Sequence, residues 1–272
     1  MNQTKISWTK VTWNPVSGCS KISEGCRHCY AESLSLRFGH TRAPWTAANV
    51  EENVRCHPDR LRQPYKLKEP TRIFTNSMSD LFHDQIPDEF IAQVFAVMAD
   101  LPQHTFQVLT KRPERAAAWG GAWSPNIWMG TSIEDAKNLT RLSSLRQCGA
   151  AVKFISAEPL LGPLDGLNLE GIAWVIVGGE SGFHMSRSPE RWMDHAWARD
   201  IRDEAVRTGT AYFFKQSSAV RTELGTALQH EDSSLWLWQQ YPGEMTAPVE
   251  VKVTDSPQYR LPRRPAPLPL LA

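Results

Sequence analysis

Short apolar runs alternate with segments of helical composition along most of the chain. The apolar runs are rich in β-branched and aromatic residues, and each is followed by polar residues. They cover residues 5–13, 72–77, 105–110, 126–131, 151–156, 173–177 and 211–214. Strands that alternate with helices predict parallel βαβ units, and nearly continuous apolar runs predict strands buried on both faces. The rhythm therefore predicts an α/β fold, a complete or partial (β/α) TIM-type barrel with parallel strands.

A doubly wound open sheet is the alternative for such a pattern. It would need a glycine-rich nucleotide-binding turn after the first strand, and the sequence has none there. The length of 272 residues suits one main α/β domain. We expect a (β/α) barrel core at residues 1–217, a C-terminal extension at 218–260, where the periodicity weakens, and a flexible proline-rich tail at 261–272.

Charge and hydropathy limit the cellular setting. The net charge of +1 gives no overall basic character, so any contact with nucleic acid would need a local patch. The N-terminal residues 1–5 are polar, and no run of about 18 apolar residues is long enough to span a bilayer. We therefore expect a soluble cytoplasmic protein without membrane contact, in which thiols stay reduced.

Three of the five cysteines lie together in residues 18–30, as Cys19, Cys26 and Cys29. Their spacing is Cys-x6-Cys-x2-Cys, and the close pair is one that a single loop can turn toward one metal centre. A closed zinc site needs four ligands, whereas three thiolates leave one metal position open. We interpret the triplet as the ligands of a [4Fe–4S] cluster with one iron free to bind a small molecule.

Two other interpretations of the triplet remain open. A histidine, namely His28, His40 or His57, could complete a Cys3His zinc site. A disulfide framework is disfavoured because five cysteines in a chain of this length is sparse usage. Cys56 and Cys148 lie apart from the triplet in sequence, and we expect neither to be a ligand.

Polar residues follow each predicted strand, and in a parallel barrel the active site lies at the strands' C-terminal ends. In chain order these residues are Asn76, Ser79, Asp80, His83, Lys111, Arg112, Ser132, Glu134, Glu158, Gly178, Gly179, Glu180 and Lys215. Each has a structural interpretation by itself: Asp80 can cap a helix, Glu134 suits a first helical turn, and the glycine pair suits a tight turn. Their convergence on one barrel mouth nevertheless predicts a ligand site.

Several blocks of the sequence carry a closer resemblance. They are Trp13-Asn14-Pro15 and residues 76–83, 109–113, 156–163, 177–182 and 213–216. With the cysteine triplet, these blocks resemble an uncharacterised three-cysteine family of phages and bacteria that is regarded as radical-SAM-like. The aromatic Tyr30 directly after Cys29 is also similar to the cluster loop of radical S-adenosylmethionine (SAM) enzymes, in which the first cysteine gap is usually shorter.

The resemblance implies a radical SAM enzyme with a [4Fe–4S] cluster and S-adenosyl-L-methionine as cofactors. Reductive cleavage of SAM would give a 5′-deoxyadenosyl radical that acts on an unknown substrate, for which we consider nucleic acid modification or repair. The electron would come from a reducing protein of the flavodoxin or ferredoxin type.

This hypothesis assigns roles to the residues at the strand ends. We expect cluster ligation by Cys19, Cys26 and Cys29; SAM contacts from Ser132, Glu158, Gly178, Gly179 and Glu180; catalytic roles for His83, Asp80 and Lys111, with His83 as a proton donor; and substrate binding by Asn76, Ser79, Arg112 and Lys215. Lys111, Arg112, Arg187 and Lys215 could meet the phosphates of a nucleic-acid substrate.

Two further functions compete with it. One is a non-enzymatic zinc- or cluster-binding module for nucleic acid, in which the strand-end residues bind a ligand but no radical forms. The other is a metal-assisted hydrolase, which the sequence disfavours because it offers no clear histidine and carboxylate metal set.

Overall fold

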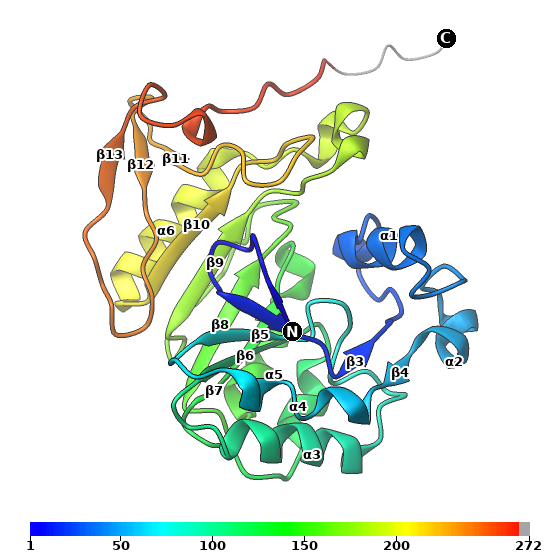
Figure 1. The fold of residues 1–272 in the computed structure, drawn as a ribbon. Helices are drawn as coiled ribbons and strands as arrows, with labels where there is room; N and C mark the ends of the chain where they lie inside the picture. Colours follow the sequence, from blue (N-terminus) through cyan, green and yellow to red (C-terminus); the bar gives the residue numbers. More distant parts are fainter. Residues whose placement is uncertain (267–272) are drawn as a thin grey trace. The chain divides into compact units, whose positions relative to one another are not determined.

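The computed structural model describes residues 1–266. Its main sheet has the strand order β1-β2-β5-β6-β7-β8-β9-β10, in which seven parallel strands follow one another in chain order and β1 pairs antiparallel with β2 (Figure 1). The strands are β1 (Asn2–Gln3), β2 (Val11–Trp13), β5 (Arg72–Thr75), β6 (Thr105–Thr110), β7 (Ile127–Ser132), β8 (Val152–Ala157), β9 (Trp174–Gly178) and β10 (Ala211–Gln216). The predicted parallel α/β fold is confirmed, in the form of a partial (β/α) barrel.

The chain divides into two compact units. Unit 1 comprises Met1–Ser132 and Thr140–Phe154, and unit 2 comprises Ile133–Leu139 and the chain from Ile155 onward. The division therefore falls inside β8. The predicted parts at 1–217, 218–260 and 261–272 stay predictions, and residues 267–272 of the predicted tail lie outside the described residues.

Unit 1 is built on β2, β5, β6 and β7, whose apolar side chains are buried as the continuous runs predict. In register, Val11 pairs with Ile73 and Ile73 with Phe106. Its helices are α1 (Tyr30–Arg37), α2 (Val50–Asn53), α3 (Asp88–Ala99), α4 (Pro113–Ala118) and α5 (Arg141–Gln147), with short 3-10 segments η1 (Glu24–Cys26), η2 (Ala47–Asn49), η3 (Pro58–Arg60) and η4 (Pro64–Lys66). Strand β3 (Val16–Ser17) leads into the cysteine loop and pairs antiparallel with β4 (Arg55–Cys56).

Strand β2 (Val11–Trp13) covers only the end of the predicted run over residues 5–13. The chain turns at the start of that run, where the Thr9 amide donates to the Ile6 carbonyl at 3.2 Å. The apolar alternation thus reflects burial of Trp8 beside Phe74, with ring centroids 4.6 Å apart, and not extended backbone.

Unit 2 carries β9, β10 and a separate antiparallel sheet. The latter consists of β11 (Leu228–Gln229), β12 (Leu235–Leu237) and β13 (Val249–Val251). The unit also contains α6 (His195–Thr208) and the 3-10 segments η5 (Ala136–Asn138), η6 (Phe183–Ser186), η7 (Pro189–Arg191) and η8 (Pro257–Tyr259).

The long helix of unit 2, α6, begins at His195. Asp194 caps it by accepting a hydrogen bond from the Ala196 amide, and Gly209 ends it in the left-handed conformation at φ 69°. Within residues 1–266, no helix is both long and apolar enough to cross a membrane.

Candidate functional site

The loop that carries the three cysteines is fixed at both ends to the loop after β5. The Gly18 amide donates to the Met78 carbonyl at 3.1 Å, and the Tyr30 hydroxyl donates to the Ser77 carbonyl at 2.8 Å. Gly18 has φ 81°, and a Cβ atom there would lie 2.0 Å from the Asn53 carbonyl oxygen. Only glycine fits this position, so the entry to the cysteine loop has one backbone path.

Two residues predicted to bind substrate hold the segment that leads into the cysteine loop. Asn76, in the left-handed region at φ 66°, accepts a hydrogen bond from the Val16 amide at 3.4 Å through Oδ1. Ser79 Oγ donates to the Val16 carbonyl at 2.9 Å. Asn14 makes the reciprocal link, because its Oδ1 accepts from the Met78 amide at 3.0 Å. These contacts explain why polar side chains follow β5.

The carboxylate of Asp80 joins the loop after β5 to the end of β6. It accepts four hydrogen bonds: from Thr110 Oγ1 at 2.6 Å, from the amides of Phe82 and Lys111 at 3.0 Å each, and from Arg112 Nη1 at 3.2 Å. Its side chain is only 7% exposed. A buried carboxylate with this many donors has its lone pairs engaged within the chain.

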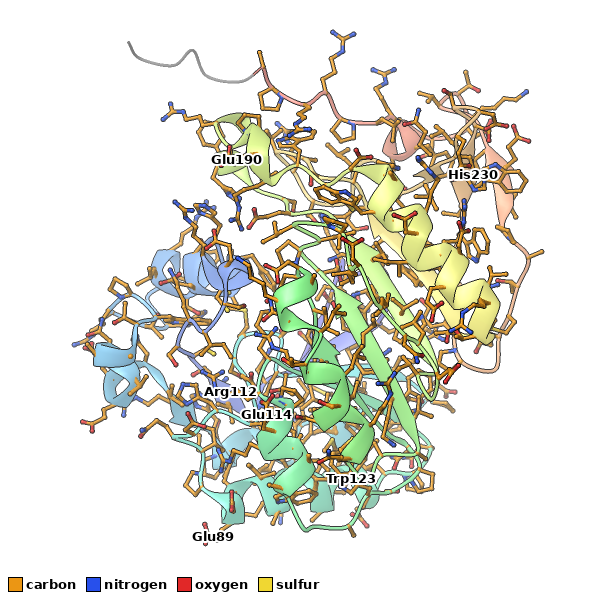
Figure 2. All side chains as sticks on the ribbon, turned by 180° about the vertical axis from the view of Figure 1, so that it is seen from behind. Glu89, Arg112, Glu114, Trp123, Glu190 and His230 are labelled. Atoms are coloured by element: carbon orange, nitrogen blue, oxygen red, sulfur yellow. The ribbon has the colours of Figure 1, made fainter. Side chains whose placement is uncertain are left out.

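Arg112 reaches from this ion pair into the cysteine loop (Figure 2). Its Nη1 lies 3.7 Å from the Cys19 sulfur, and its Nη2 donates to Ser20 twice, to the carbonyl at 3.2 Å and to Oγ at 3.0 Å. The guanidinium is buried. A cation held against a cysteine sulfur favours negative charge on that sulfur.

His83 supports the same serine. Its Nε2 lies 2.8 Å from Ser20 Oγ, and its Nδ1 accepts a hydrogen bond from the Gln85 amide at 3.1 Å. The network assigns the ring proton to Nε2, since Nδ1 is the acceptor. Burial, together with the charge of Arg112, holds the pKa of His83 below its usual range. Both ring nitrogens of a neutral His83 are thus engaged.

Two of the three thiols have a raised pKa. Burial first and the charge of Asp80 second raise the pKa of Cys19 to about 12, and Arg112 opposes the rise. Burial also raises the pKa of Cys29, which the charge of Lys111 opposes. Repulsion from Cys26 is a smaller cause of the raised pKa of both other thiols.

The triplet does not form a ready-made metal geometry. Across residues 1–266, no group of three or more His, Cys, Asp or Glu side chains is arranged to hold a single metal ion. The donor set does fit a thiolate cluster, because three cysteines share one loop and a buried guanidinium faces the sulfur of Cys19. Metal binding would have to drive deprotonation of these thiols, since ligation requires the thiolate.

A second group of predicted residues lies at the strand ends of unit 2. Lys215 Nζ forms an ion pair with Glu158 Oε1 at 2.9 Å, and Ser156 Oγ donates to Glu158 Oε2 at 3.3 Å. A Cβ atom on Gly178 would lie 2.5 Å from Glu158 Oε1, so glycine at the end of β9 leaves room for this carboxylate. Glu158, Gly178 and Lys215 therefore form one small cluster.

Glu180 belongs to a buried ion pair that the sequence analysis did not identify. Arg191 donates to it from Nε at 2.5 Å and from Nη2 at 2.9 Å, and His184 Nε2 lies 3.5 Å from Oε2. A Cβ atom on Gly179 would lie 2.3 Å from the Ser218 amide nitrogen, so this glycine permits close backbone packing. No strand-end rule could indicate Arg191, because it is the last residue of η7, eleven residues after Glu180.

The predicted site residues fall into the two units as follows. Unit 1 contains Cys19, Cys26, Cys29, Asn76, Ser79, Asp80, His83, Lys111, Arg112 and Ser132, and unit 2 contains Glu158, Gly178, Gly179, Glu180 and Lys215. Ser132 is buried and its carbonyl accepts from Arg141 Nη1 at 2.8 Å. Ser20, which links Arg112 to His83, was missed because a serine between cysteines carries no pattern of its own.

Unit 2 also has an open polar cavity of about 370 Å³ outside the predicted site. His195, Arg199, Glu231 and Arg264 are among its lining residues. Arg199 pairs with Glu231 at 2.9 Å, and His195 Nε2 lies 2.8 Å from Ser217 Oγ, so several of its polar groups have partners within the chain.

Comparison with known proteins gives the following matches. A family described as "Protein of unknown function (DUF5131)" matches residues 3–242. No curated protein shows a significant match. A solved structure, "Spore photoproduct lyase complexed with dinucleoside spore photoproduct", is similar at 13% sequence identity with a TM-score of 0.44, over 76% of this chain and 64% of that chain. The chain thus spans less than two thirds of the length of that lyase.

Proposed function

The chain belongs to the DUF5131 family, and we propose that this protein is an iron–sulfur enzyme of the radical SAM type. The observation that carries the proposal is the guanidinium of Arg112, which Asp80 holds 3.7 Å from the sulfur of Cys19 in a loop with three cysteines. When bound, a three-cysteine [4Fe–4S] cluster with one open iron supplies the electron that cleaves SAM into methionine and a 5′-deoxyadenosyl radical.

In this proposal Cys19, Cys26 and Cys29 hold the cluster, and the surrounding residues fix the loop. Arg112 offsets the negative charge that three thiolates bring together. A lysine would not replace it, because one planar guanidinium contacts the sulfur, Ser20 and Asp80 together. The contacts of Arg112 support this positioning role over the predicted binding of substrate.

The contacts also bear on the proposed catalytic residues. Asp80 has four donors and His83 has both ring nitrogens engaged, so we propose that both act by positioning Arg112 and Ser20. Lys111, which follows β6 directly before Arg112, keeps its proposed catalytic role.

For SAM we propose contacts from Ser132, Glu158, Gly178, Gly179 and Glu180. The amino acid end of SAM carries an ammonium and a carboxylate. The ion pair of Glu158 with Lys215 offers a partner for each of these charges. Glu180 is bound twice by Arg191, so we expect its contribution to depend on that arginine. Nucleic acid modification or repair stays our proposal for the substrate class.

Metal content of the anaerobically purified chain tests the cluster. We expect about four irons per chain, lost on replacing Cys19, Cys26 or Cys29 by alanine. Cys56→Ser and Cys148→Ser are matched controls that should keep the iron. Stoichiometric zinc in a colourless protein would instead identify a zinc site and reject the radical mechanism.

Spectroscopy with SAM tests the cofactor. Adding SAM to the reduced cluster should change its electron paramagnetic resonance signal, and turnover should release methionine and 5′-deoxyadenosine. Glu158→Gln should keep its iron but bind SAM more weakly, by roughly 1.5–3 kcal/mol for a lost charge-assisted hydrogen bond. An iron-loaded protein that shows no response to SAM would favour a cluster-bearing binding module.

A further inference from the structure

Helix α1 follows the cysteine loop directly (Figure 1), and its large apolar side chains are exposed. The buried residues are Ala31, Glu32 and Ser35. Amphipathic helices of globular proteins normally bury the apolar stripe. The reversal has a local cause, because Glu32 accepts from the Trp45 amide at 2.8 Å and pairs with Lys21 at 2.7 Å.

The exposed stripe is aromatic and aliphatic. Tyr30, Leu34 and Phe38 recur every four residues and are 52%, 37% and 63% exposed. Leu36 on the same helix and Ile22 in the cysteine loop are also exposed. We call these five residues the α1 patch. Tyr30, Leu34 and Phe38 share one stripe, and exposed apolar side chains gathered in this way mark an interaction surface.

The surroundings of the α1 patch are basic. Within residues 18–45, Lys21 pairs with Glu32 at 2.7 Å and Arg27 with Glu24 at 3.2 Å, so Arg37 and Arg42 give the segment a net charge of +2. The guanidinium carbon of Arg37 lies 5.6 Å from the Phe38 ring centroid. Exposed apolar side chains beside net positive charge are typical of a protein interface, and the charge favours an acidic partner.

We propose that the α1 patch is the docking surface for an acidic one-electron donor protein. The inference rests on the proposed function, which needs an electron delivered to the cysteine loop. Ile22 lies between two of the proposed ligands, and Tyr30 follows the third, so a partner on this patch would sit next to the cluster. The donor loses one electron, the cluster gains it, and no bond or proton is exchanged.

The test compares reduction by a protein with reduction by a small molecule. The probes are an acidic flavodoxin in its fully reduced form and dithionite, each mixed anaerobically with the cluster-loaded chain. Leu34→Glu and Phe38→Glu should slow reduction by flavodoxin about tenfold or more and leave reduction by dithionite unchanged. Phe183→Glu is the matched control, since Phe183 is an exposed aromatic residue of unit 2.

Binding measured by biolayer interferometry separates this proposal from the proposed function. Flavodoxin should bind the parent chain, more weakly as salt rises, and should bind both α1 variants more weakly than the Phe183 control. Equal reduction of all variants by flavodoxin, or no binding to the iron-loaded parent, would overturn the docking surface and leave the cluster standing. Absence of iron would reject the proposed function. If the α1 variants lost binding to single-stranded DNA and kept binding to flavodoxin, the α1 patch would be assigned to nucleic acid.

Discussion

Replacing Asp80 by asparagine tests the network that fixes the cysteine loop. The asparagine oxygen can keep the hydrogen bonds from Thr110 and Phe82, but its amide group then faces the Lys111 amide and the Arg112 guanidinium, both of which are donors. Each donor that loses its acceptor costs about 1–3 kcal/mol, and removing one member of a buried ion pair costs about 3–5 kcal/mol. These costs overlap, so we expect a loss of about 3–5 kcal/mol in the free energy of unfolding.

Urea denaturation and calorimetry of the metal-free protein measure this loss. At roughly 2–4 °C per kcal/mol for a chain of this size, the melting temperature should fall by roughly 10 °C. Asp88→Asn is the matched control, because Asp88 also pairs with an arginine, Arg115, but its side chain is 72% exposed. We expect that change to cost less than about 1 kcal/mol. Equal effects of the two substitutions would refute the stabilising role of the buried network.

Three further predictions concern glycines and a buried histidine. Gly18→Ala should destabilise the fold by more than about 2 kcal/mol, because the new Cβ atom would clash with the backbone. Gly39→Ala is the control: Gly39 has φ 68° and open space around it, so the change should cost only about 1 kcal/mol of backbone strain. Similar denaturation midpoints for the two variants would contradict this prediction. Gly179→Ala, which meets the backbone of another segment, should unfold at lower denaturant than Gly178→Ala, which meets the end of a flexible side chain, and the reverse order would be contrary to the packing described. Burial lowers the pKa of His195 to about 4, so the unfolded state binds the proton first as pH falls below 6.5. The stability contributed by neutral His195 is therefore complete above pH 6.5 and is lost between pH 6.5 and pH 4. His195→Gln should reduce this loss by up to about 3 kcal/mol, and an unchanged dependence of stability on pH would count against the prediction.

The strands could be predicted because a strand buried on both faces has a continuous run of apolar residues. Phe213 and Phe214 are neighbours in chain order and both fully buried, which only an element covered on both sides allows. The predicted strand is wrong over residues 5–10, because apolar residues indicate burial and a turn can bury Trp8 as completely as a strand can.

The candidate site could be predicted in its location but not in its pairings. The barrel rule places Asp80 and Glu180 at strand ends, where the structure has them. Such a carboxylate can either bind a ligand or form an ion pair within the chain. Which of these applies depends on arginine side chains from other segments. Arg191 holds Glu180 and Arg112 holds Asp80, and no local pattern distinguishes these arginines from solvated ones.

The path of the chain through its two units sets the order in which they can be completed during synthesis. The chain leaves unit 1 after Ser132, returns at Thr140 and leaves again after Phe154, so a cut at any single peptide bond leaves at least one unit incomplete. On the ribosome, the cysteine loop and both members of the Asp80–Arg112 pair have been translated once residue 112 is added. Unit 1 acquires its last segment only with residue 154, and nearly all of unit 2 follows afterwards. Because domains form as units from the N-terminus, the nascent chain can assemble the cysteine loop before most of unit 2 exists.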